Sequence, residues 1–458
     1  MRRHTGKTAS TQARQALSIA AVAALTLTGT SALAYADDKK GDALDEISAV
    51  EKMSAEYLTK EFGLSEGDAL GRVRDQKKHA TTARELESKL GDRTSGSYID
   101  QKRGKLIVNV ADEESAKEVK GDNVEAKVVK TSAKEVSENR RKAEEKLGDK
   151  LTSSSLDTSR NLIVLNVPVK ESEAAKKAVE GLKNIEVQAT DNHAEPEYAL
   201  TNIGGGGDNG GGTKGGGAKG GGVKGGDNGG GVKGGNDNGR GGDNGGGAKG
   251  QAIYGGQEIR ANKFMCSLGF NAKKGNQDVF ITAGHCTGGG VSFTRNNKPL
   301  GKAQASNYPG ADMGYATLES GWSGKEAVDK YNGKAVVVKG SEEAPVGAAV
   351  CKSGRTTGWT CGTITAKNVT VNYRSKNGST DRITGLTQTN VCTSSGDSGG
   401  AWIAGEQAQG VHSGGNGNKI VDLKAGVCKH RTGQPNIAYF QPIKPILEKY
   451  GLTLKTRQ

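Results

Sequence analysis

The stretch TSSGDSGGAW at residues 393–402 surrounds one serine, Ser398, with glycines and places Asp397 directly before it. A serine hydroxyl becomes a nucleophile when a histidine accepts its proton and a carboxylate orients that histidine. His285 ends an apolar run in ITAGHC, and Asp312 precedes another in GADMGYATL. These residues predict acyl transfer, with Ser398 as nucleophile, His285 as general base and Asp312 as the orienting acid.

The glycines beside Ser398 fit the same chemistry. An acyl-transfer transition state carries negative charge on the carbonyl oxygen, which backbone N–H groups stabilise. Gly396 and Ser398 are placed to donate their amides as an oxyanion hole, and we expect a side chain at 396 to crowd that oxygen. Asp397 is too close in sequence to orient the histidine, so we expect it to hold the loop through a buried ion pair.

A second arrangement uses the same serine. GDSGG also satisfies the G-x-S-x-G elbow of α/β-hydrolases, and Ser398, Asp422 and His430 follow the chain order of that fold. An α/β-hydrolase needs strands alternating with helices around the elbow, and this region shows little helix. The order His285, Asp312, Ser398 matches the chymotrypsin arrangement.

The N-terminus predicts export. Basic residues precede a short apolar stretch, and AYA at 34–36 supplies small residues for cleavage, so residues 1–36 are interpreted as a signal peptide rather than a membrane anchor. The net charge is +13, but 51 acidic residues are interspersed among 64 basic ones. We expect a secreted, extracellular monomer without nucleic-acid or membrane partners, and no motif indicates a metal ion or an organic cofactor.

Cysteine usage agrees with export. All six cysteines lie in the C-terminal half of the chain, which predicts three disulfides. Six cysteines allow about fifteen pairings, all of which the sequence leaves open. Sequential pairing is the simplest, and it would join Cys266 to Cys286, Cys351 to Cys361 and Cys392 to Cys428.

Composition divides the rest of the chain into three regions. Residues 37–202 contain an internal repeat, 90–119 and 147–176, in which each copy predicts a strand followed by a helix. Residues 203–251 form a linker, where 27 of the 47 residues from 204 to 250 are glycine, which predicts a flexible tether. Residues 252–458 alternate short strands with turns and end in a helical stretch, which predicts an all-β sandwich or barrel.

Several separated motifs resemble one family. TAGHC and GDSGG are similar to the signatures of chymotrypsin-fold serine peptidases, and SGRTTGWTCGTITAKNVTVNY resembles the bacterial streptogrisin/α-lytic protease branch. The resemblance implies an all-β, chymotrypsin-like double β-barrel with a C-terminal helix, preceded by an α/β prodomain of two subdomains. In this family the prodomain is a folding catalyst and an inhibitor of its own protease. Maturation near Ile253 would give a family-like start, whereas cleavage upstream would leave a Gly-rich tail.

The resemblance also implies substrate contacts. Ser413, Gly414 and Gly415 would pair their backbone with the substrate, and Lys352 stands where many relatives carry an arginine that pairs with the equivalent of Asp397. His412 and Thr393 resemble the glutamate-specific branch, which implies a preference for Glu at P1, the residue before the cleaved bond. Gly415 departs from that branch, which carries serine there. The alternatives are a large hydrophobic P1 preference or a catalytically silent binding module.

Overall fold

The computed structural model describes residues 49–191, 194–200, 250–261, 263–374, 379–416, 420–422, 429–430 and 435–457. The predicted signal peptide, nearly all of the predicted linker and Cys428 lie outside these ranges. Within these ranges, no helix combines the length and the apolar character needed to cross a membrane.

The N-terminal region contains the same unit twice, after helix α1 (Ala49–Phe62). Each unit has a long helix, two antiparallel strands, a short helix and a third strand parallel to the second. The first unit comprises α2 (Glu66–Leu90), β1 (Thr94–Asp100), β2 (Lys105–Val110), α3 (Glu113–Glu118) and β3 (Val124–Val128). The second comprises α4 (Ala133–Leu147), β4 (Ser153–Asp157), β5 (Leu162–Pro168), α5 (Ser172–Ala178) and β6 (Ile185–Thr190).

Local sequence explains why both units fold alike. Gly91 and Gly148 end their long helices at φ values of 54° and 50°, which glycine adopts without strain. In the second unit, Ser132 and Glu135 form a capping box that starts α4. The apolar run in β5 then buries its side chains against α4 and α5. The sequence repeat therefore appears as a structural repeat.

The first barrel of the C-terminal region is built from seven strands, and one further short strand pairs with each edge. Its strand order is β12-β13-β16-β15-β14-β10-β11, with β27 beside β12 and β8 (Ala199–Leu200) beside β11. The bounds are β10 Glu258–Arg260, β11 Phe264–Ser267, β12 Phe270–Lys274, β13 Gln277–Thr282, β14 Ser292–Arg295, β15 Lys298–Asn307, β16 Met313–Thr317 and β27 Thr453–Leu454. Its core includes Phe280, Phe293 and Leu300, all buried.

The second barrel closes on itself, because β19 pairs with both β20 and β22. Its members are β19 (Ala349–Gly354), β20 (Gly358–Arg374), β21 (Thr380–Thr389), β22 (Ala401–Ala404), β23 (Gln407–Gly415) and β26 (Ala438–Pro442). A separate sheet joins β9 (Gln251–Gly255), β17 (Trp322–Asp329) and β18 (Ala335–Val337). Helix α7 (Ile443–Tyr450) follows β26, and a two-stranded sheet pairs β24 (Ile420–Asp422) with β25 (Lys429–His430).

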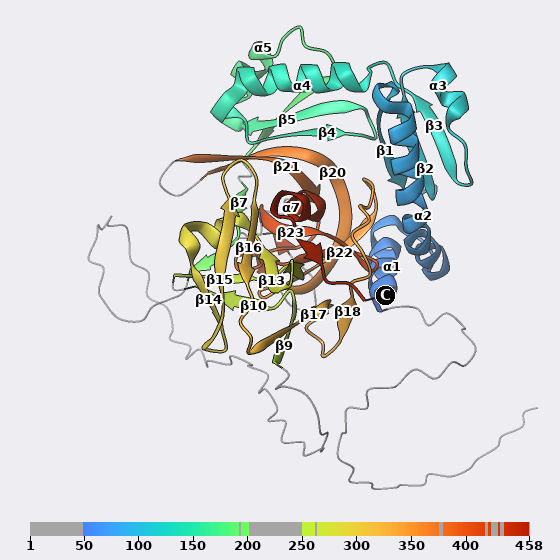
Figure 1. Ribbon diagram of the computed structural model, residues 1–458. Coiled ribbons are helices and arrows are strands. Elements are labelled where there is room, and N and C mark those ends of the chain that lie inside the picture. Colours follow the sequence, from blue (N-terminus) through green and yellow to red (C-terminus); the bar gives the residue numbers. More distant parts are fainter. Residues whose placement is uncertain are drawn as a thin grey trace, which may run out of the picture. The chain divides into compact units, whose positions relative to one another are not determined.

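The predicted double β-barrel with a C-terminal helix, preceded by an α/β region, is confirmed (Figure 1). The α/β-hydrolase arrangement is wrong, since the segment that carries Ser398 lies between strands β21 and β22. The first barrel supplies His285, in the short helix α6 (Gly284–Thr287), and Asp312, just before β16. The second barrel supplies Ser398, so the site lies where the two barrels meet.

The second N-terminal unit continues the sheet of the second barrel. Strand β4 pairs antiparallel with β20, with Ser154 opposite Thr370. The side chain of Asn372 donates to the carbonyl of Leu151 at 2.8 Å, and Arg382 forms an ion pair with Glu144 at 2.6 Å. Backbone pairing and charged contacts therefore join the N-terminal region to the protease barrel.

Candidate active site

Ser398, His285 and Asp312 form one hydrogen-bonded chain. The Nδ1 atom of His285 lies 2.8 Å from Oδ2 of Asp312, and its Nε2 atom lies 2.7 Å from Oγ of Ser398. Asp312 is fully buried and accepts only, so the Nδ1 atom carries a proton. The Nε2 atom of the neutral ring is then free to accept the proton of Ser398.

Asp312 is itself held from three sides. Its Oδ1 atom accepts the backbone N–H of His285 at 2.9 Å, and its Oδ2 atom also accepts the hydroxyl of Ser413 at 2.6 Å. Because Ser413 gives its proton to Asp312, the phenol of Tyr373, 2.9 Å away, donates to Ser413. Burial raises the pKa of Tyr373, which keeps that donor protonated. The sequence placed Ser413 on the substrate strand, and the structure adds this contact with Asp312.

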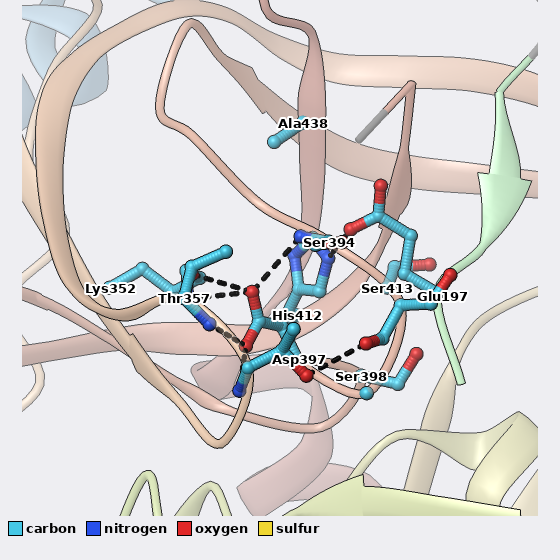
Figure 2. Close-up of polar contacts among 12 residues, drawn as sticks. Glu197, Lys352, Thr357, Ser394, Asp397, Ser398, His412, Ser413 and Ala438 are labelled. Atoms are coloured by element: carbon cyan, nitrogen blue, oxygen red, sulfur yellow. Dashed lines mark hydrogen bonds and ion pairs between the residues drawn. The ribbon is translucent and has the colours of Figure 1, made fainter. Parts of the chain in front are cut away.

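Asp397 organises the loop before the nucleophile (Figure 2). Its carboxylate and the ammonium of Lys352 are both fully buried and lie 3.0 Å apart. Burial by itself raises the pKa of Asp397, but the charge of Lys352 and the hydroxyl of Thr357 outweigh it, so the pKa lies below its ordinary value. The same carboxylate accepts the backbone N–H groups of Thr356, Thr357 and Ser394 at 2.9, 3.1 and 3.0 Å.

The glycines beside Ser398 are also required by the shape of the loop itself. Gly396 has a φ of 101° and Gly399 a φ of 79°, in the range that favours glycine. A Cβ at Gly396 would meet the hydroxyl of Thr356 and the Arg355 side chain, and a Cβ at Gly399 would overlap the Thr282 hydroxyl. The loop therefore needs glycine for its turn and its packing.

A segment of the N-terminal region crosses this site. Strand β7 (Glu195–Pro196) pairs antiparallel with Gly415 and Gly414, and β8 pairs antiparallel with β11. Between them, the carbonyl oxygen of Glu197 accepts the backbone N–H groups of Gly396 and Ser398, the latter at 3.4 Å. Residues 195–200 thus run through the site like a substrate, with the Glu197 carbonyl at the predicted oxyanion-hole donors. No motif in the sequence pointed to this segment.

The side chain of Glu197 is buried against His412 (Figure 2). Its Oε2 atom lies 2.7 Å from Nε2 of His412, and the exposed fractions of the two side chains are 1% and 0%. The Trp402 ring packs against His412 with centroids 5.9 Å apart, and Thr393 is buried in the loop before Asp397. The structure therefore brings His412 to a carboxylate, in the pocket next to Ser398.

Two of the expected disulfides are present, joining Cys266 to Cys286 and Cys351 to Cys361. The third expected pair includes Cys428, which lies outside the described residues. Among the described residues, one group of possible metal ligands comprises Cys266, His285 and Cys286. Its two cysteines are bonded to each other, so neither offers the thiolate that a metal binds.

Fold and contacts define a chymotrypsin-like serine endopeptidase. The family model described as Trypsin matches residues 253–429, and the one described as Alpha-lytic protease pro N-terminal matches residues 68–129. The chain belongs to the trypsin family of serine proteases, in its streptogrisin/α-lytic branch.

Individual relatives match different parts of the chain. Streptogrisin-C of Streptomyces griseus is 31% identical over 446 residues, which cover 95% of this chain and 82% of that protein. Glutamyl endopeptidase 2 of the same organism is 36% identical over 204 residues, covering 44% of this chain and 99% of that protein. The match to the crystal structure of Thermobifida fusca Protease A spans 45% of this chain and 100% of the Protease A chain, at 43% identity and a TM-score of 0.39.

Replacing Lys352 by Met should lower the free energy of unfolding by about 3–5 kcal/mol, because it leaves Asp397 buried without its partner. The pKa of Asp397 is lower in the folded protein, so the pair stabilises the fold above the ordinary Asp pKa of about 4 and loses that effect as the pH falls through the folded value. The difference between wild type and variant should therefore shrink in acid. Urea denaturation of Ser398→Ala chains, which avoids autolysis, measures it.

The matched control is Lys339→Met, which removes an exposed ion pair with Glu406. That change should cost less than about 1 kcal/mol. Equal losses for the two variants would contradict the role assigned to the buried pair.

Proposed function

We propose that the chain is a secreted serine endopeptidase, made as a preproenzyme, that cleaves peptide bonds after glutamate through an acyl-enzyme. In this proposal residues 1–36 are the signal peptide, 37–202 the prodomain, 203–251 the linker and 252–458 the protease domain. The prodomain assists folding of the protease and inhibits it. The observation that carries the specificity is the buried contact between His412 and the Glu197 carboxylate.

Each step of acyl transfer has a group in place. The Ser398 hydroxyl attacks the substrate carbonyl carbon while His285 accepts its proton, and the Gly396 and Ser398 amides stabilise the resulting oxyanion. His285 then gives that proton to the leaving amine. Asp312 stabilises the protonated ring, and the hydroxyl of Ser413 holds Asp312 in the required orientation. Water then attacks the acyl-enzyme in the same way, with His285 as general base, and releases the product carboxylic acid.

The P1 pocket fits a carboxylate better than an apolar side chain. An ionised carboxylate removed from water needs a charged partner or strong donors. Nε2 of His412, 2.7 Å from Glu197, supplies one at the floor of the pocket. His412 is in turn fixed by backbone bonds to the nucleophile loop, from its N–H to the Gly400 carbonyl at 2.9 Å and from the Gly399 N–H to its own carbonyl at 2.7 Å. The similarity to a glutamyl endopeptidase supports the same preference.

Ser398→Ala should reduce kcat/KM of the matured protein by about a million-fold, because no nucleophile remains. Ser413→Ala is the matched change in the same network. It removes one hydrogen bond to Asp312 and should cost roughly tenfold, mainly in kcat. Labelling with a fluorophosphonate checks the assignment, since the adduct should form on Ser398 alone. An adduct on Ser413, or full activity of Ser398→Ala, would overturn it.

His412→Leu should lower kcat/KM for peptides with Glu at P1 by roughly 10- to 150-fold, the effect of losing a charged hydrogen bond. Peptides with Phe or Leu at P1 should change little. A panel of peptides that differ only at P1, with Gln as the uncharged match for Glu, measures both ratios. A wild-type preference for Phe or Leu would instead favour an ordinary hydrophobic specificity and exclude the role of His412.

A further inference from the structure

We propose that Ser398 cleaves the bond between Glu197 and Tyr198 of its own chain, an inference that rests on the proposed function. The Glu197 carbonyl accepts hydrogen bonds from both Gly396 and Ser398. A carbonyl oxygen bound by these two amides presents its carbon to the Ser398 hydroxyl. The Glu197 side chain occupies the pocket of the residue before the cleaved bond.

The segment is fixed on both sides of that bond. On the acyl side, Glu195 and Pro196 pair with Gly415 and Gly414. On the amine side, Ala199 pairs with Met265. Fixing both sides of a bond beside a nucleophile converts attack into an intramolecular step, which is worth many orders of magnitude in rate. The bond is therefore held in the position of a substrate bond.

Tyr198, on the amine side of the bond, contacts the general base His285. The ring of Tyr198 lies against the His285 ring, with centroids 5.8 Å apart, and against Phe264 at 5.9 Å. His285 Nε2 also contacts Ser398 Oγ, so the same ring lies beside the nucleophile and beside the residue that would leave.

The region near Ile253 offers no comparable bond. Ile253 is fully buried in β9, which pairs in parallel with β17. A peptide bond enters a protease site only as an extended, accessible strand, and β9 would first have to leave its sheet. The geometry therefore favours cleavage before the Gly-rich segment rather than after it.

The reaction balances with water as the only co-reactant. Ser398 Oγ forms an ester with the Glu197 carbonyl carbon, the bond to the Tyr198 nitrogen breaks, and the serine proton passes through His285 to that nitrogen. Water then adds to the ester carbon, giving its proton through His285 to Ser398 Oγ. One product ends in the Glu197 α-carboxylate, and the other begins at the Tyr198 α-amine and keeps the Gly-rich segment as its N-terminal extension.

The two products stay in contact after the cut. The new C-terminus at Glu197 lies in the pocket that recognises glutamate, and the second N-terminal unit remains attached through β4 and β20. Activity should appear only when the cleaved N-terminal region dissociates or is degraded, later than the cut itself.

The test uses the full chain in four forms: wild type, Ser398→Ala, Glu197→Gln and Glu180→Gln. Glu180 is exposed in a turn outside the site and provides the same chemical change as a matched control. Intact mass and N-terminal sequencing follow the products over time. Wild type and Glu180→Gln should yield a fragment that begins at Tyr198, at a rate independent of concentration. Ser398→Ala should stay whole, and Glu197→Gln should cut about 100-fold more slowly.

Two further measurements serve as controls for folding and for specificity. Unchanged circular dichroism and thermal midpoint of Glu197→Gln show that its slow cleavage is not misfolding. The peptide AEPEYAL, residues 194–200, is then given to the matured enzyme. Cleavage of this peptide after its second glutamate supports the proposed function by itself. If the full chain is nevertheless cut first at another bond, or if Ser398→Ala is cut at the same bond, the inference is overturned and the proposed function stands. A chain cut at this bond by an enzyme without glutamate preference overturns the proposed specificity alone.

Discussion

The buried carboxylate of Asp397 is the constraint on which the geometry of the site depends. It is completely shielded from water, so it must be neutralised and hydrogen-bonded where it lies. Lys352 supplies the charge. Backbone N–H groups of Ser394, in the same loop, and of Thr356, in the turn between β19 and β20, supply donors. The turn that satisfies this carboxylate also turns the Gly396 and Ser398 amides toward one oxygen. Ser398 and the two amides proposed as oxyanion donors are thus positioned by a buried charge outside the catalytic chain of Ser398, His285 and Asp312.

The sequence predicted the residues that depend on local pattern. His285 and Asp312 each adjoin an apolar strand, and short polar motifs at strand ends are visible without knowing which strands pair. The duplicated α/β unit was visible for a related reason, since each copy contains its own helix ending at a glycine and its own buried strand. Lys352 and Asp397 could be paired from the resemblance, although only the structure shows that both are fully buried.

The contacts that the sequence did not predict join distant segments. Glu197 lies 215 positions before His412, and nothing in AEPEYAL distinguishes it from an ordinary extended connection. Its position follows from backbone pairing with Gly414 and Gly415, which depends on how both barrels fold. The packing around Gly396 was also invisible in the sequence. Thr356, which leaves no room for a side chain there, lies 40 positions before Gly396.

In the proposed function, the contact between His412 and Glu197 links specificity to regulation. The contact that would select glutamate in a substrate is the one that holds Glu197 of the same chain. Strengthening it would tighten substrate recognition and would equally slow the departure of the N-terminal region. A tethered segment acts at a high effective concentration, so even a modest pocket is saturated before cleavage. After cleavage, occupancy depends on β4, Glu144 and the other contacts outside the pocket. The affinity for the cleaved N-terminal region can therefore be changed without changing the affinity for substrates, through residues that never contact a substrate.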